Sequence, residues 1–176
     1  MTSMIDLHAG PGAGFDQPFE MLEACHQRVE RMLVLLQRLS AHLAAHGADM
    51  QVQQAARDVM RYFDIAAPHH HEDEERHVLP RLREQGRTAL ADRVLSEHRT
   101  MAIAWAGVRC MLQTVEQGDR LADGEAVAEQ WRAFAALYRD HMALEEREVF
   151  PAARQHIDAD GLRAMADEMA RRRGVH

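Results

Sequence analysis

Two segments of this sequence carry the same arrangement of histidine and glutamate. His70 is followed four residues later by Glu74, and in the second segment His141 precedes Glu145 by the same interval. The segments align at an offset of 71 residues and also share Glu-Glu-Arg, Val and Pro. Residues four apart lie on one face of an α-helix, so each segment presents an imidazole beside a carboxylate. This combination of side chains is typical of ligands for transition metals.

A single histidine precedes each segment at a matched distance. His26 lies 44 residues before His70, and His98 lies 43 residues before His141. One His-x-x-x-Glu pair is common by chance, whereas two pairs with matched upstream histidines are not. Two glutamates buried in a protein core would be costly without a cation. We therefore predict six metal ligands: His26, His70, Glu74, His98, His141 and Glu145.

The predicted ligands suit a pair of iron ions. Imidazole suits iron and carboxylate suits hard ions, and the two oxygens of a carboxylate can bridge cations about 3.5–4 Å apart. The repeat predicts two histidines for each metal and two bridging glutamates, Glu74 and Glu145. Manganese is an alternative, as is zinc, although structural zinc sites are usually closed and tetrahedral. Such a pair leaves open coordination positions for oxygen, nitric oxide, peroxide or water.

The elements that position these residues are expected to be helices. The sequence is rich in Ala, Leu and Met and has only five Pro and ten Gly, which favours helix over sheet. Asp16 is a candidate N-cap for the first helix, and Pro68 predicts a kink or local irregularity in the second. Apolar spacing and helix-ending residues predict helices over 18–46, 49–85, 88–117, 124–151 and 158–173.

Short connections between these helices predict antiparallel neighbours, and hence an all-α, up-down-up-down four-helix bundle with a short C-terminal helix. Residues 1–16 are Gly-rich and aperiodic and are expected to form a flexible arm. Residues 17–156 are expected to form the bundle, and 157–176 a C-terminal helix that packs on the same domain. At about 1.5 Å per residue, His26, His98 and Glu74 each lie roughly 14 Å from the same end of the bundle. We expect all six predicted ligands to meet at one level.

Composition and charge exclude several classes of protein. The formal charge is −7, from 21 basic and 28 acidic residues, which argues against a nucleic-acid binder. Two cysteines, Cys25 and Cys110, do not make a disulfide framework. The N-terminus lacks the pattern of a signal peptide, and no apolar stretch approaches the about 18 residues of a membrane span. We expect a cytoplasmic protein that binds neither nucleic acid nor membrane.

The other residues near the motifs have weaker assignments. His77 lies seven residues after His70 on the same face, and is either a further ligand or, as we expect, a rim residue. His69 and His71 face other sides of the helix, so we expect them to be solvated or to support a ligand from outside. A further possibility is that Glu97 accepts a hydrogen bond from an imidazole of a neighbouring helix.

Together these motifs resemble the hemerythrin-like family, also called the HHE cation-binding domain. The resemblance covers roughly residues 17–156 and implies a four-helix bundle with a non-haem di-iron centre. The family includes oxygen carriers, oxygen and redox sensors, iron sensors and proteins that help repair iron centres under nitrosative stress. Oxygen carriers have a further histidine four residues after the equivalent of His98, where this sequence has Ala102. The four-histidine, two-glutamate set is more similar to the repair and iron-sensing branches. The residues that carry the resemblance are His26, His70, Glu74, His98, His141 and Glu145.

The leading interpretation is a non-haem di-iron protein that binds or senses a small diatomic ligand, such as oxygen or nitric oxide, or an oxidant. No acid or base beyond the predicted ligands is apparent, which favours binding or sensing over catalysis. One alternative is a di-iron oxidoreductase, or an iron donor in iron-centre repair. Another is an interaction protein in which metal only holds the bundle together, so that removing the metal would unfold it.

Overall fold

The computed structural model of the protein describes residues 14, 16–155 and 157–174. The arm predicted over 1–16 therefore lies almost entirely outside the described residues. All regular structure in the described residues is helical, without strands, which confirms the all-α class. Helical residues run without a break through four long rods and one short helix. None of these helices contains an apolar stretch long enough for a membrane span.

The long rods are built from α-helices, with single π-helical turns in two of them. The first rod is α1 (Pro18–His46), and the third is α5 (Thr88–Glu116). The short helix is α8 (Ala159–Arg172). The second rod contains α2 (Met50–Arg61), the π turn η1 (Tyr62–Ala66), α3 (Ala67–Asp73), the π turn η2 (Glu74–Val78) and α4 (Leu79–Glu84). The fourth rod contains α6 (Gly124–Leu144), the π turn η3 (Glu145–Val149) and α7 (Phe150–Arg154).

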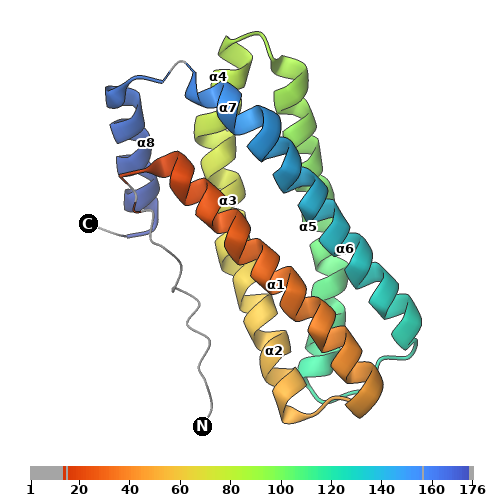
Figure 1. Ribbon diagram of the computed structural model, residues 1–176. Helices are drawn as coiled ribbons and strands as arrows, with labels where there is room; N and C mark the ends of the chain where they lie inside the picture. Colours follow the sequence, from red (N-terminus) through yellow and green to blue (C-terminus); the bar gives the residue numbers. More distant parts are fainter. Residues whose placement is uncertain (1–13, 15, 156, 175–176) are drawn as a thin grey trace.

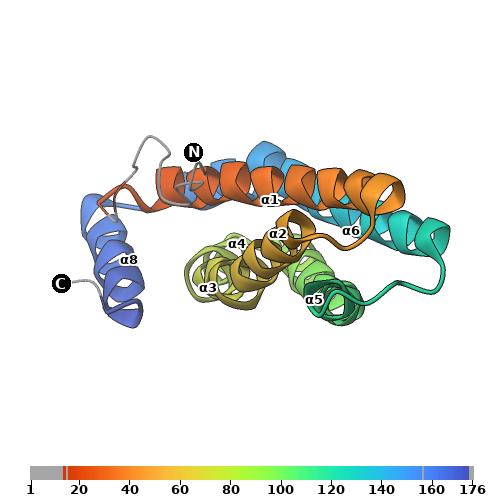
Figure 2. The ribbon, with the colours of Figure 1, turned by 90° about the horizontal axis from the view of Figure 1, so that it is seen from below.

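Successive rods run in opposite directions, as the colours of Figure 1 show. The first and third rods each pack against the second and fourth. Seen from below, α1 and α6 form one layer over α2 and α5 (Figure 2), and α8 lies across the end of the rods beside α1. Gly86 and Gly118, with φ of 75° and 82°, end two of the rods. After each glycine a backbone N–H reaches back to the carbonyl five residues earlier, in the manner of a Schellman turn.

One predicted detail of the helix ends is wrong. Asp16 does not cap α1, because Gln17 occupies the N-cap position and no side chain bonds to the first turn. Pro18 takes the first helical position, where its missing N–H leaves no bond unmade. Asp49 and Asp123 do cap α2 and α6 through their carboxylates.

Three π-helical turns interrupt the second and fourth rods, and each ends two residues before a proline: Pro68, Pro80 or Pro151. A proline has no N–H for the carbonyl four residues earlier, and its ring presses against that carbonyl. In each turn the N–H just before the proline bonds instead to the carbonyl five residues back. The irregularity predicted at Pro68 is therefore confirmed. The other two turns begin at Glu74 and Glu145.

Two apolar clusters fill the interior, one towards each end of the rods. The first core cluster includes Leu36, Val59, Leu112 and Trp131. The second core cluster contains Leu22, Leu79, Val94 and Phe150, together with Met165 and Met169 of α8. Along each rod the predicted ligands lie where one cluster gives way to the other. A layer of buried polar side chains therefore separates two apolar regions.

Candidate metal centre

The structure brings together the side chains that the sequence singled out. Each rod contributes one imidazole, and the second and fourth rods each add a glutamate at the start of a π turn. None of these residues is more than 4% exposed, and the two glutamates are fully buried. The residues that meet are His26, His70, Glu74, His98, His141 and Glu145.

These residues form two groups of four that share both glutamates. One group contains His26 and His70, the other contains His98 and His141, and the ligand atoms within each group lie within 4.8 Å of one another. Glu74 presents Oε1 to His70 Nε2 at 3.2 Å and Oε2 to His98 Nε2 at 3.3 Å. A carboxylate that offers one oxygen to each group has the placement of a bridging ligand.

Glu145 lies between the groups in the same way. Its Oε2 is 3.2 Å from His26 Nε2, and its Oε1 is 3.1 Å from His141 Nε2. The ring planes of His26 and His70 are 81° apart, and those of His98 and His141 are 69° apart. Within each pair the rings meet edge to face, so the lone pairs of the two ring nitrogens can converge on one point.

The donor atoms fit a cation. All four carboxylate oxygens of Glu74 and Glu145 are buried without a hydrogen-bond partner among the described residues. Nε2 of His98 and Nε2 of His141 are in the same condition. Buried carboxylates without compensation are costly, and imidazole with carboxylate is a donor set for iron, manganese or zinc. The residues present are therefore suited to hold metal.

Three further glutamates hold the imidazoles from outside. Each lies near a ring Nδ1, which fixes the tautomer whose Nε2 lone pair points inward. The role considered for Glu97 is thereby confirmed. Glu75 and Glu146 were not predicted, although the two Glu-Glu doublets of the repeat were a signal for them. The pairs are His26 with Glu146 at 2.9 Å, His98 with Glu75 at 2.9 Å and His141 with Glu97 at 2.8 Å.

His70 is the exception to this pattern. Its Nδ1 is buried and has no hydrogen-bond partner in the described part of the chain. Glu97 directly precedes His98, whereas Cys25 directly precedes His26, its counterpart in the repeat. The chain thus has a cysteine where a symmetric site would have a glutamate for His70, so its two halves differ.

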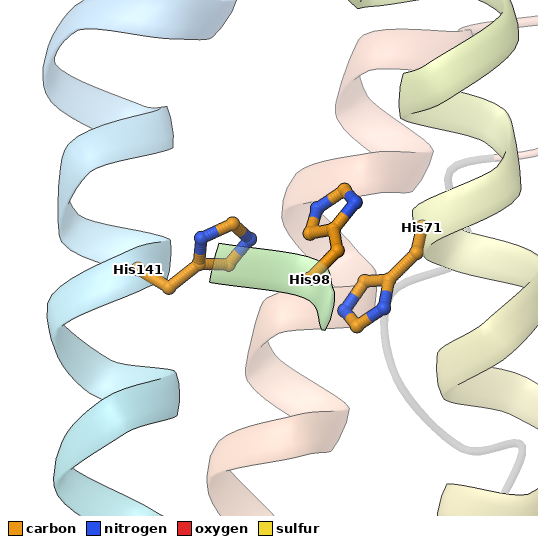
Figure 3. Close-up of side chains that lie close together, drawn as sticks. All are labelled: His71, His98 and His141. Carbon is orange, nitrogen blue, oxygen red and sulfur yellow. The ribbon is translucent and has the colours of Figure 1, made fainter. Parts of the chain in front are cut away.

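His71 is closer to the centre than the sequence indicated. Its ring is parallel to that of His98, with centroids 4.1 Å apart and planes at 8°, and Tyr138 also stacks against it at 6.0 Å. With His98 and His141 it forms a third group of potential ligands (Figure 3). His77 lies outside the two groups, as expected for a rim residue, and its Nε2 is 2.6 Å from Glu168 of α8.

Burial and charge set the protonation of the cluster. Burial, and next the charge of Glu145, raise the pKa of Glu74 to about 7. Burial opposes a charge on His98, but the carboxylates of Glu145 and Glu74 outweigh it and raise the pKa of His98 to about 10. Burial lowers the pKa of His71 well below its usual range, so this ring is neutral. The space between the two glutamates therefore favours positive charge.

A pocket of about 350 Å³ opens beside His98, between α3 and α5. Phe63, Trp105 and Tyr138 make it largely apolar, and His71 lies on its wall. A small molecule can therefore approach the His98 side of the centre from outside.

Comparison with known proteins identifies the family. A family model described as the hemerythrin HHE cation binding domain matches residues 17–153. The chain belongs to this hemerythrin HHE family. The matched segment contains all six residues of the two groups, so the resemblance inferred from the motifs is confirmed. A relative in Haemophilus influenzae, an uncharacterized protein, is 32% identical over 166 residues, which cover 93% of this chain and 94% of the relative.

Proposed function

We propose that this hemerythrin HHE protein holds a pair of iron ions and binds or senses a small ligand, such as oxygen or nitric oxide, or an oxidant. The observation that carries the proposal is the placement of Glu74 and Glu145. Each directs one oxygen towards the His26 and His70 group and the other towards the remaining group. Two metals bridged by two carboxylates account for this arrangement, whereas one metal leaves half of the donors unused.

The protein's own residues orient the donors and exclude water. Glu146, Glu75 and Glu97 hold three imidazoles with Nε2 turned inward, and the two core clusters close the layer above and below. Paired iron bound there would supply open coordination positions for a small ligand. Manganese and zinc are alternatives that the same donors would accept.

The pocket beside His98 favours ligand binding over a purely structural metal. A metal that only holds helices together needs no access from outside, and structural sites are usually closed. Here a cavity of about 350 Å³ reaches a predicted ligand, with largely apolar walls that leave room for a small molecule. We therefore place binding or sensing ahead of a structural role.

Replacing the bridging carboxylates tests the paired site. The double variant Glu74→Ala, Glu145→Ala is expected to lose both irons while its far-ultraviolet circular dichroism shows that the helices persist. The matched control is Glu72→Ala with Glu148→Ala, because these glutamates lie on the same rods but are 38% and 46% exposed. Iron analysis of both proteins decides the matter. Two irons per chain in the Glu74→Ala, Glu145→Ala variant would rule out the bridging assignment.

A further inference from the structure

We propose that His71 is not a metal ligand but a hydrogen-bonding group for the small molecule that the centre binds. The inference rests on the proposed function, since it needs a ligand at the paired site. It goes further by assigning one residue, one side of the centre and one pocket to that ligand.

Ring geometry separates His71 from the proposed ligands. An imidazole binds a metal in the plane of its ring, along the lone pair of its nitrogen. The planes of His71 and His98 are only 8° apart and stacked, with centroids 4.1 Å apart, so a single ion cannot lie in both planes. The ring planes of His98 and His141 are 69° apart, so one ion can lie in both planes. If His98 holds a metal, His71 in this position does not bind the same one.

His71 is nevertheless within reach of whatever binds beside its neighbours. One of its ring nitrogens lies within 4.8 Å of ring nitrogens of His98 and His141. Its Nε2 is buried and has no hydrogen-bond partner in the part of the chain that the structure describes. A buried polar group without a partner costs free energy, which a polar atom of a bound molecule would recover. The ring is therefore placed to donate to a ligand on the His98 and His141 side.

The pocket provides the space for such a ligand. It is lined by His71, His98 and Ala102, and the methyl group of Ala102 leaves room that a larger side chain would occupy. Tyr138 stacks on His71 with ring planes 23° apart, which limits rotation of the imidazole. The pocket has room for a molecule of two or three atoms, and the N–H of His71 calls for a hydrogen-bond acceptor on that molecule. Azide is a suitable probe of this chemistry.

The test compares azide binding to the iron-loaded protein and its variants. His71→Phe keeps a planar ring but removes the N–H, while His71→Gln keeps an N–H donor. His69→Phe is the matched control, because it makes the same change two residues away, outside the pocket lining. We expect His71→Phe to weaken azide binding roughly threefold to tenfold, the loss of one hydrogen bond. His71→Gln and His69→Phe should stay closer to the unmodified protein.

Infrared spectra supply a second readout that a packing defect would not change. The antisymmetric stretch of bound azide should shift in D₂O in the unmodified protein and lose that shift in His71→Phe. Equal azide affinity and equal isotope shifts in both proteins would overturn the inference, as would an unmodified protein with two irons that binds no azide. Loss of iron from His71→Phe would also overturn it, since His71 would then be a ligand. Fewer than two irons in the unmodified protein would refute the proposed function itself.

Discussion

At the scale of single residues, the site depends on glutamates that touch imidazoles from the side away from the centre. Glu146 and Glu75 are equivalent in the repeat, and each contacts the lone upstream histidine of the other half, His26 or His98. Such contacts typically change metal affinity by one to two orders of magnitude. The orientation of the predicted ligands therefore depends on glutamates that are not themselves predicted ligands.

Glu146→Gln tests this role. The amide keeps the size of the side chain but cannot accept from His26 Nδ1 as strongly as a carboxylate does, so iron affinity should fall about tenfold or more. Glu148→Gln is the control, because Glu148 is exposed and pairs only with Arg147 among the described residues. Competition with an iron chelator measures both affinities. If the two variants release iron equally readily, the contact between Glu146 and His26 has no such role.

Ala102→Leu tests the route to the centre. A leucine at this position would fill part of the pocket, so the association rate of azide should fall severalfold while iron content stays the same. Ala106→Leu is the control, because Ala106 is exposed one turn further along the same helix and does not line the pocket. Stopped-flow absorbance gives the rates. An unchanged rate in Ala102→Leu would show that ligands enter elsewhere.

The six residues of the two groups could be predicted because their types and spacing occur twice. His71 could not be predicted from spacing, because its position depends on contacts with His98 and Tyr138 from two other rods. The same holds for Glu75 and Glu146, since either glutamate of each doublet could have faced inward.

At the scale of elements, the π turns place the buried glutamates of the site on the same face of each rod as the residues of the second core cluster that follow them. Glu74 and Leu79 are five residues apart and both almost fully buried, as are Glu145 and Phe150. In a regular α-helix residues five apart point in different directions, because one turn takes about 3.6 residues. A π turn adds one residue and brings both onto one face. The proline after each turn disfavours a return to the regular α-helical hydrogen bond, and so holds the extra residue at that place.

The extra residue in η3 should therefore be removable. We expect deletion of Arg147 combined with Pro151→Ala to give a regular helix in which Glu145 and Phe150 still share a face, with little loss in melting temperature. Arg147 is 66% exposed, so its side chain contributes little packing. Deletion of Arg132, 61% exposed in α6, is the control and should unfold the protein, because it rotates every later side chain. Equal loss of stability in both deletions would contradict this explanation of the π turn.

At the scale of the whole molecule, ion pairs join the C-terminal end of α8 to the second rod. Arg172 and Arg173 both contact the carboxylate of Asp73, which is fully buried directly before Glu74. Glu168 contacts both Arg172 and His77. Packing of a C-terminal helix on the same domain was expected, but the network that holds α8 joins residues 99 apart, so its contacts could not be inferred from local patterns. The helix itself, expected over 158–173, followed from the spacing of its apolar residues.

The pH dependence of stability tests this attachment. The hydrogen bond from Arg172 is the main cause that lowers the pKa of Glu168 to about 2. A depressed pKa means that the carboxylate stabilises the fold above its ordinary pKa of about 4.3, and that this contribution is lost as the pH falls towards 2. Glu168→Gln should cost about 1 kcal/mol at pH 7 and much less near pH 2. Urea unfolding at several pH values measures the difference, with Glu129→Gln as an exposed control. A difference that does not change with pH would contradict the assignment.

The iron content of the protein, combined with its Mössbauer spectrum, tests the paired site most directly. Protein from iron-supplemented cells would be analysed anaerobically and then exposed to oxygen and to nitric oxide. We expect two irons per chain that are magnetically coupled and whose spectrum changes with one or both gases. A single zinc per chain, or a pair of irons that responds to neither gas, would contradict a centre built to bind small ligands.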